Sequence, residues 1–513
     1  MVSFLAFLLS FTAQAETFDQ LSRSLSPGLN RNWNIHGYQR VRSSGYYNLD
    51  LDHGLTPSGA SLFPVPITEG QWLSSSDLRL RADISGVSER GSVAVNVRID
   101  MLDNIRLGSL PQGTAIDSTS QLAPEDSIVV RQAYATALTP LGFVVAGRMG
   151  TTWGLGMLAN SGDCIDCNTV DVSDRVGFLT SLAGHLWAIT YDFSSTGAGI
   201  SRMYNVPDID LESTDDAHSI TFAVMKMYSD FALSRRRLAG KNSFEYGFYS
   251  STRDQLNDIS VSYLSEEALI TQTALLERNY QARAFDGWFR FTAPKARIEW
   301  EAAYMIASIG NPSLLSGVAF EETVTSNQFG MALETELGDP EGKLRYGLDL
   351  GLASGDSAPG FGARAHFLDT PPVAGDLDGP QFSVGKDNTV DNFRFHPDFQ
   401  IDRILWREII GTVTDAIYIK PHLEWELAKA GPGILKLHQG LVYSMAMEGN
   451  STPSGEQPLG LEWDPSIEYV STDGMGFQVD YAILFPLDGL ENTIEGLNAR
   501  PAQLIRTHLR YRF

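Results

Sequence analysis

The sequence ends Gln503-Leu504-Ile505-Arg506-Thr507-His508-Leu509-Arg510-Tyr511-Arg512-Phe513, and this stretch decides the fold. Every second residue counted back from Phe513 is Tyr511, Leu509, Thr507 and Ile505, whereas the alternate positions carry arginine or histidine. Successive side chains of a β-strand point to opposite faces, so this strand has one apolar and one cationic face. In a water-soluble protein the apolar face needs a core to cover it, yet the sequence stops at Phe513.

An amphipathic strand that ends on phenylalanine, with aromatics on one face, resembles the closing strand of a bacterial outer-membrane β-barrel. The resemblance implies that Tyr511 and Phe513 form part of the signal read by the barrel-assembly machinery. The alternative on this stretch alone is an ordinary edge strand of a soluble sheet. The pattern along the rest of the chain favours the barrel.

Composition narrows the class of protein. The chain has 513 residues, enough for two to four ordinary domains or for one large membrane barrel. Its formal charge of −24 and isoelectric point near 4.7 argue against a nucleic-acid partner, which would need a basic face. Only two cysteines occur, so disulfides are not the main scaffold. The 10% aromatic content and 47 glycines are typical of a turn-rich β protein.

The first fifteen residues read as a secretory signal. An apolar run from Phe4 to Leu9 is followed by Ala13-Gln14-Ala15, which predicts cleavage before Glu16. The usual lysine or arginine near Met1 is missing, so either the start codon lies upstream or the signal is atypical. A membrane anchor is excluded by length, because a spanning helix needs about 20 apolar residues. We therefore expect a signal peptide at 1–15 and a single barrel domain at 16–513.

Alternation of apolar and polar residues recurs along the chain. Between Leu78 and Met101, two alternating runs flank the turn Ser88-Glu89-Arg90-Gly91 and predict a hairpin with one apolar and one charged side. Each such run is roughly ten residues long, the length that a tilted strand needs to cross a bilayer. We predict strands at 33–48, 76–86, 92–102, 127–138, 143–150, 175–182, 185–193, 218–228, 231–251, 284–292, 296–307, 327–337, 343–353, 415–428, 434–446, 460–470, 475–485 and 503–513.

The connections alternate between tight turns and long polar segments. Turns such as Ala183-Gly184 are interleaved with segments such as 151–174 and 354–414. Short periplasmic turns on one rim and long external loops on the other are typical of outer-membrane barrels, whereas a β-sandwich or a propeller has no reason to segregate them. We therefore predict an all-β, antiparallel transmembrane barrel of about eighteen strands. Because the strand pattern is weak in 229–283, sixteen and twenty strands are the alternatives. In that region Ala268 to Arg278 looks helical.

Several sequence blocks carry a closer resemblance. They include Tyr38-Gln39-Arg40-Val41-Arg42, Asn48-Leu49-Asp50-Leu51, Thr56-Pro57-Ser58-Gly59, Gly147-Arg148-Met149, Trp153-Gly154-Leu155-Gly156-Met157-Leu158, Cys164-Ile165-Asp166-Cys167, Asp174-Arg175 and Arg403-Ile404-Leu405-Trp406-Arg407-Glu408. Together these blocks resemble an uncharacterised, porin-like family of delta-proteobacterial outer-membrane proteins, over most of the mature chain. The resemblance implies a fold and a location in the outer membrane; it implies no substrate.

The inward positions of the predicted strands differ in charge between the two halves of the chain. The early strands and the last strand would form a basic wall of the pore: Arg40, Arg42, Arg79, Arg81, Arg98, Arg131, Arg148, Arg506, Arg510 and Arg512. The later strands would form an acidic wall: Glu299, Glu301, Glu334, Glu336, Asp349, Glu424, Glu426, Glu462, Asp464 and Asp480. Closure would place the two walls across the lumen and create a transverse field, unless the charges neutralise one another within each wall.

Cys164-Ile165-Asp166-Cys167 allows three readings: a redox pair, half a zinc site, or a loop staple. Redox catalysis would need a helix start in a βαβ context, and zinc would need two more ligands. Because the environment beyond the inner membrane is oxidising, we predict a local disulfide that holds an external loop. Aspartates around it offer calcium hard oxygen donors, although such groups are also found merely solvated: Asp163, Asp166, Asp171 and Asp174.

These patterns predict an integral outer-membrane barrel that acts as a passive, porin-like channel for small hydrophilic solutes, with no cofactor. Segment 354–414 or the helix near 265–278 would fold inward as a constriction. A non-conducting surface or adhesive protein that works through its acidic loops is the alternative, followed by a hydrolase with His422 or His438 as base. The expected partners are membrane lipid and lipopolysaccharide, the assembly machinery and small solutes.

Overall fold

The computed structural model describes residues 33–63, 71–88, 91–107, 127–197, 199–200, 209–210, 212–259, 275–313, 322–364, 372–379 and 387–513. The predicted signal at 1–15 lies outside these residues.

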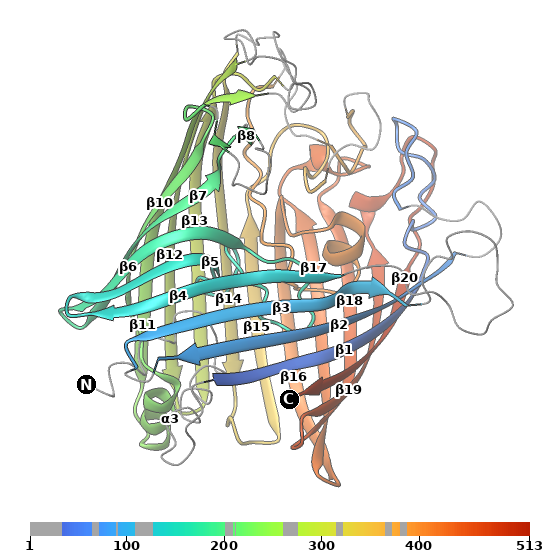
Figure 1. Cartoon of the computed structure of the whole chain (residues 1–513). Helices are drawn as coiled ribbons and strands as arrows, with labels where there is room; N and C mark the ends of the chain where they lie inside the picture. Colours follow the sequence, from blue (N-terminus) through green and yellow to red (C-terminus); the bar gives the residue numbers. More distant parts are fainter. Residues whose placement is uncertain are drawn as a thin grey trace, which may run out of the picture.

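Eighteen antiparallel strands form one closed barrel, which confirms the predicted fold class (Figure 1). The strands are β1 (Trp33–Tyr47), β2 (Trp72–Val87), β3 (Val93–Arg106), β4 (Ile128–Thr139), β5 (Gly142–Gly150), β6 (Val172–Leu182), β7 (His185–Ser195), β10 (Ala217–Lys226), β11 (Ser243–Ile259), β12 (Leu275–Ala293), β13 (Ala296–Ile309), β14 (Val324–Leu337), β15 (Leu344–Ala353), β16 (Ala416–Ala430), β17 (Gly433–Ala446), β18 (Pro458–Ser471), β19 (Met475–Pro486) and β20 (Ala502–Arg512). A separate two-stranded sheet pairs β8 (Gly199–Ile200) with β9 (Ile209–Asp210).

The seam of the barrel joins the last strand to the first. β1 pairs with β2 on one side and with β20 on the other, and Val41 lies opposite Leu509. The alternation in β20 is as predicted, because Ile505 and Leu509 are about half exposed whereas Arg506 and His508 are buried. Closure leaves no unpaired edge, and Ile505, Leu509 and Tyr511 of β20 point outward.

Turn lengths differ between the two rims, as predicted. Leu182 at the end of β6 pairs with His185 at the start of β7, so the connection is only two residues long. Ala183 and Gly184 both have positive φ, 53° and 74°, the conformation of the tight turn that matches strand twist. The opposite rim carries the long connections, among them 151–171 and 354–415. Within the described residues, no helix is long and apolar enough to cross a membrane.

Two predictions in the weak region were wrong. The strand predicted at 231–251 begins instead with helix α3 (Asp230–Leu238), because the Ser229 hydroxyl accepts a hydrogen bond from the Ala232 amide and caps the helix. β11 starts only at Ser243. Residues 275–278, predicted as the end of a helix, belong to β12, where Glu277 pairs with Asn257. The remainder of that predicted helix lies outside the described residues.

An apolar core lies inside the barrel. The described parts of connection 354–415, here called the inner segment, contribute the buried residues Phe361, Phe393, Phe395 and Trp406. Phe361 and Trp406 meet edge to face, with ring centroids 5.9 Å apart. The inner segment ends in a single π-helical turn, η4 (Leu405–Ile410), whose apolar side chains join the same core. Burial of apolar surface therefore holds this long connection against the inner wall.

Candidate functional site

Buried arginines line one side of the barrel interior. Arg40 on β1 and Arg79 and Arg81 on β2 alternate with outward apolar residues, and each exposes 2% or less of its surface. Further predicted residues on β1, β3, β4 and β20 are also at least partly buried: Arg42, Arg98, Arg131, Arg506 and Arg510. The structure thus brings most of the predicted basic wall together.

Arg148 does not belong to this wall. Its side chain is 52% exposed and pairs with Asp174 at 2.7 Å, in the phase of β5 that faces outward. The inward phase of β5 carries Phe143, Val145 and Met149, which pack in a second apolar cluster inside the barrel. The lining between β5 and β12 is therefore partly apolar rather than polar throughout.

The connection 151–171, here called the disulfide loop, folds into the barrel against the arginines. Three arginines donate hydrogen bonds to main-chain carbonyl oxygens of the loop. Arg81 donates to Gly162 at 2.6 Å, Arg40 to Ile165 at 2.7 Å and Arg79 to Cys167 at 2.6 Å. The sulfurs of Cys164 and Cys167 are bonded to each other. The prediction that the disulfide holds an external loop was wrong. Hydrogen bonds from the guanidinium groups to main-chain carbonyl oxygens hold this loop inside the barrel.

Aspartates neutralise the arginine wall. The Nε and Nη2 atoms of Arg81 donate to the two carboxylate oxygens of Asp100, at 2.6 and 2.8 Å. The further pairs are Arg40 and Arg42 with Asp77, Arg79 with Asp103, Arg98 with Asp83 and Asp163, and Arg131 with Asp100 and Asp103. The wall is basic in residue type, but its charges are largely cancelled in place and its arginines serve to hold the loop.

Carboxylates of the opposite wall bind main-chain amides of both inward connections. Glu462 on β18 accepts from the amides of Arg403 and Ile404, both at 2.8 Å, at the start of η4. Glu301 on β13 accepts from the Leu155 amide at 2.5 Å. These two predicted residues therefore position backbone, and their carboxylates face amides rather than open water.

The other predicted acidic residues lie on the inward faces of β13 to β19, mostly beside basic side chains. The pairs are Glu299 and Glu334 with Arg297, Glu336 with Arg345, Asp349 with His422, Glu424 with Lys436, and Asp480 with Arg403 and His508. Glu426 sits on β16, and Asp464 on β18 is 7% exposed. Sequence reasoning missed Arg403 and Arg407, because neither lies on a strand.

Asp166 links the two inward connections. Its carboxylate lies 2.7 Å from Arg42 on β1 and 2.6 Å from Arg407 on η4. Burial alone would raise the pKa of Asp166, but Arg407 and Arg42 hold it well below its usual range. Nearby, Asp398 of the inner segment accepts from the amides of Asn168 and Thr169, at 2.9 and 2.6 Å. The disulfide loop and the inner segment thus form one constriction.

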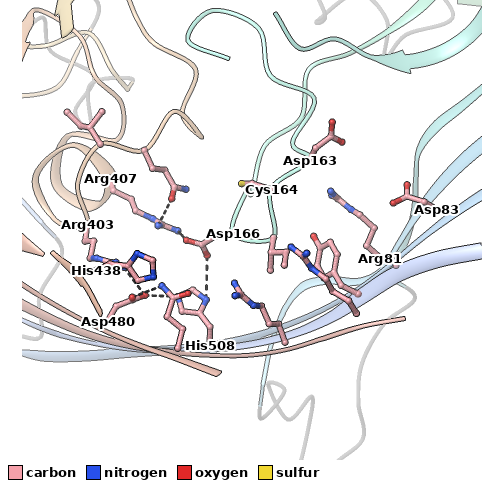
Figure 2. A pocket seen from close by; sticks show the side chains of 18 of the residues that line it. Arg81, Asp83, Asp163, Cys164, Asp166, Arg403, Arg407, His438, Asp480 and His508 are labelled. Atoms are coloured by element: carbon pink, nitrogen blue, oxygen red, sulfur yellow. Dashed lines mark hydrogen bonds and ion pairs between the residues drawn. The ribbon is translucent and has the colours of Figure 1, made fainter. Parts of the chain in front are cut away.

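A cavity of about 940 Å³ lies between the two walls and is bounded by this constriction (Figure 2). Its lining includes Cys164, Asp166 and Arg407 from the inward connections and Arg81 from the arginine wall. Four of the nine histidines of the chain also line it: His36, His422, His438 and His508. A smaller cavity of about 220 Å³ shares Asp349, Gln400, Ile401 and Lys420 with the first and continues the space beside the inner segment.

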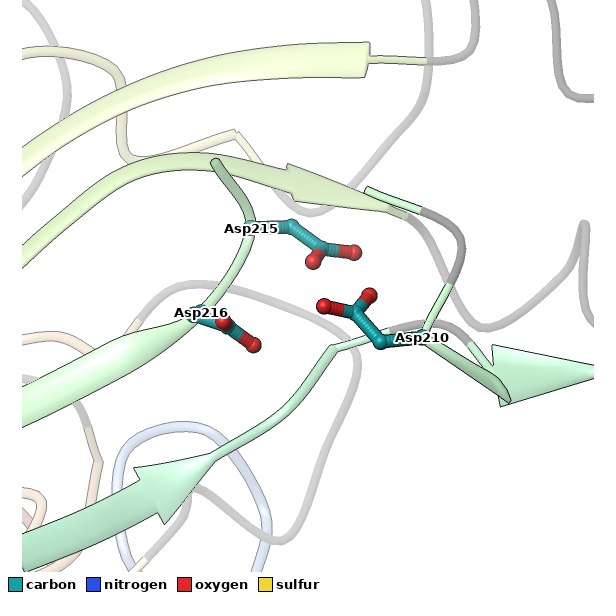
Figure 3. Close-up of side chains that lie close together, drawn as sticks. All are labelled: Asp210, Asp215 and Asp216. Atoms are coloured by element: carbon teal, nitrogen blue, oxygen red, sulfur yellow. The ribbon is translucent and has the colours of Figure 1, made fainter. Parts of the chain in front are cut away.

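The four aspartates predicted as calcium donors point to separate partners. Asp163 pairs with Arg98, Asp166 with Arg42 and Arg407, and Asp174 with Arg148, whereas Asp171 accepts from the Asn160 amide. A different trio has carboxylates close together: Asp210, Asp215 and Asp216, beside the β8–β9 sheet (Figure 3).

The two residues of the predicted assembly signal lie at the barrel seam. Phe513 exchanges two main-chain hydrogen bonds with Gly37, at 3.0 and 3.1 Å. The side chains of Tyr511 and Phe513 are both 51% exposed.

Comparison with known proteins shows a likeness of fold. No family model matches the chain, and no curated protein matches it either. Similar solved structures include OccAB1 of Acinetobacter baumannii (10% identity, 96% of this chain and 98% of that chain, TM-score 0.48), OccK11 of Pseudomonas aeruginosa (9%, 93% and 96%, 0.47) and a BenF-like porin of Pseudomonas fluorescens Pf-5 (11%, 95% and 100%, 0.47).

The apolar side chains on the outer face of the barrel indicate where the protein is located. Large apolar side chains remain exposed on strands around the barrel, among them Phe222, Trp425, Phe477 and Ile505 at 42–48%. A closed barrel satisfies its backbone hydrogen bonds internally, as the hydrocarbon of a bilayer requires. With its apolar outer face and fully paired strands, the chain is an integral β-barrel protein of the bacterial outer membrane.

Proposed function

We propose that the protein is a porin-like channel through which small hydrophilic solutes diffuse passively. The observation that carries the proposal is the charged cavity of about 940 Å³ inside a closed barrel of eighteen strands. A barrel of this size encloses an aqueous lumen where loops do not fill it. The constriction formed by the disulfide loop and the inner segment would restrict passage to small solutes.

The two histidines of the hydrolase alternative lie beside carboxylates of the lumen wall. His438 Nε2 lies 3.2 Å from Glu468, and His422 Nδ1 lies 3.2 Å from Asp349. Both imidazoles therefore contact carboxylates of the lumen wall, as expected of a wet lining. Membership of the delta-proteobacterial family, contact with lipopolysaccharide, recognition by the assembly machinery and calcium in external loops stay predictions.

Conductance of the purified protein in a planar bilayer tests the proposal. Folded barrel is first verified by gel migration, which should differ between boiled and unboiled samples because a barrel without an edge resists SDS. We expect discrete conductance steps in KCl. Correctly folded protein that gives no steps would contradict the channel and favour the surface-protein alternative.

A further inference from the structure

One side of the large cavity contains charged side chains whose hydrogen-bonding atoms are not all paired within the described part of the protein. The cavity-lining arginines Arg81, Arg98, Arg403, Arg407 and Arg510 each pair with a carboxylate. Lys420 on β16 lines both cavities, yet no hydrogen bond or ion pair within 4 Å joins its ammonium group to any residue that the structure describes. Its charge acts on Asp402 and Asp464 from a greater distance.

Asp464 is an acidic residue of the same cavity with one carboxylate oxygen that lacks a hydrogen-bond donor in the described ranges of the chain. It exposes 7% of its surface. Arg403 and Glu462 also interact with this carboxyl group, but its Oδ1 atom has no hydrogen-bond partner among the described residues. Asp402, 5% exposed, lies beside it, with both carboxylate oxygens directed to the Trp406 amide at 3.0 and 3.2 Å. A buried carboxylate oxygen without a donor is costly unless a ligand or solvent supplies one.

A glycine separates the lysine from the aspartate. Gly440 on β17 lines the cavity and lies opposite Asp464 in the strand register. A methyl group placed on Gly440 would lie 3.7 Å from the Lys420 Cε atom and 3.7 Å from the Asp464 Cβ atom. The missing side chain therefore leaves a gap one residue wide between a free ammonium group and a carboxylate. We call Lys420, Gly440, Asp464 and Asp402 the Gly440 notch.

We propose that the Gly440 notch binds small zwitterions whose ammonium and carboxylate groups lie close together, such as an α-amino acid. The ligand's ammonium group donates to Asp464, with Asp402 adding negative charge, and its carboxylate accepts from Lys420. Both contacts are charge-assisted hydrogen bonds, which are stronger than neutral ones. The narrow gap at Gly440 disfavours ligands with widely separated charges. This inference rests on the proposed channel and names the class of solute that it selects.

Glycine is the simplest probe, and its uncharged isomer glycolamide is the matched comparison. In the planar bilayer, the measured quantity is the concentration of each compound that halves the KCl conductance of the folded protein. We expect glycine to act at lower concentration than glycolamide, acetate, methylammonium or 6-aminohexanoate. In Lys420→Met and in Asp464→Asn, the half-blocking concentration of glycine should rise on the order of tenfold, because each change removes one charge-assisted hydrogen bond.

Two further variants distinguish the notch from general effects of lumen charge. Lys436→Met removes a lysine that already pairs with Glu424 at 2.7 Å, and should leave the glycine response unchanged. Gly440→Leu should fill the gap and weaken the response while KCl conductance persists. If KCl conductance persists but glycine acts equally on the wild type, Lys420→Met and Asp464→Asn, zwitterion binding at the Gly440 notch is contradicted. The proposed channel is not contradicted by that result. If no folded variant conducts, the channel itself fails.

Discussion

The carboxylate of Asp166 and the guanidinium of Arg407 lie 2.6 Å apart, although they belong to two different connections of the barrel (Figure 2). Arg42 approaches the same carboxylate from β1, so one charged group joins the wall, the disulfide loop and the inner segment. The width of the lumen therefore depends on a small number of ion pairs.

Asp166→Asn should loosen this junction. Loss of the carboxylate leaves Arg42 and Arg407 side by side without their shared anion, and breaking a buried pair costs about 3 kcal/mol. We expect larger and noisier single-channel currents from barrels that still show the heat-sensitive gel shift. Asp174→Asn is the matched control, because its pair with Arg148 is half exposed and should matter little. Identical currents in wild type and Asp166→Asn would contradict the junction.

Replacing both Cys164 and Cys167 by serine should leave the barrel assembled. The carbonyls of the disulfide loop keep their hydrogen bonds to Arg40, Arg79 and Arg81, which do not depend on the sulfurs. Because the loop lies inside the barrel, protease added to intact cells should not cut between 161 and 174 even in the double variant. Intact cells should show no free thiol in the wild type. Cleavage in that interval would place the loop outside after all.

Reversal of Arg79, Arg81 and Arg98 to glutamate should destabilise the loop as well as change selectivity. Each new carboxylate would face an existing one, Asp103, Asp100 or Asp83. We expect the folded gel band to be lost at a lower temperature, and ion selectivity to shift toward cations by an amount that shrinks with added salt. Arg148→Glu, on the outer face, should not change selectivity. Unchanged selectivity of the triple variant at low salt would argue against a conducting path along this wall.

The pH dependence of stability should carry a contribution from Asp415, at the long-loop end of β16. Burial raises its pKa to about 7, while its carboxylate accepts from the amides of Met447 and Glu448. The folded state therefore holds a proton that the unfolded state releases near pH 4. Stability should fall as pH rises from about 4 to about 7 and then level off. Asp415→Asn should flatten this slope in thermal gel-shift series; an unchanged slope would assign it to other groups.

The barrel could be predicted from the sequence because the alternation of apolar and polar residues is visible within each strand. Alternation in β20 assigns Ile505 outward and Arg506 inward without knowledge of any neighbour. Arg148 was assigned to the wrong face because β5 carries apolar residues in both phases, and only the cluster with Trp153 shows which phase is inward. The charge pattern of the sequence favoured a transverse field, and the pairing of arginines on β1 and β2 with aspartates such as Asp100 and Asp103 on β3 was only its alternative.

The constriction was harder to predict, because it depends on contacts between distant segments. Nothing in the sequence around Glu462 indicates that its carboxylate will accept three amides at the start of η4. The inward fold of segment 354–414 was one of two alternatives, the other being the helix near 265–278, whereas the inward fold of the disulfide loop was not predicted. The loop reads as polar and solvated until the arginines that hold its carbonyls are placed opposite it.

The apolar core of the inner segment limits which substitutions this connection can accept over generations. In barrels whose loops stand free in solvent, such loops can accept many substitutions. Here Phe361, Phe393 and Trp406 are 2% exposed or less, and truncating one of them would cost about 3–5 kcal/mol. Substitutions at these buried positions would weaken the packing that holds the constriction, so this stretch should change more slowly than loops that stand free in solvent.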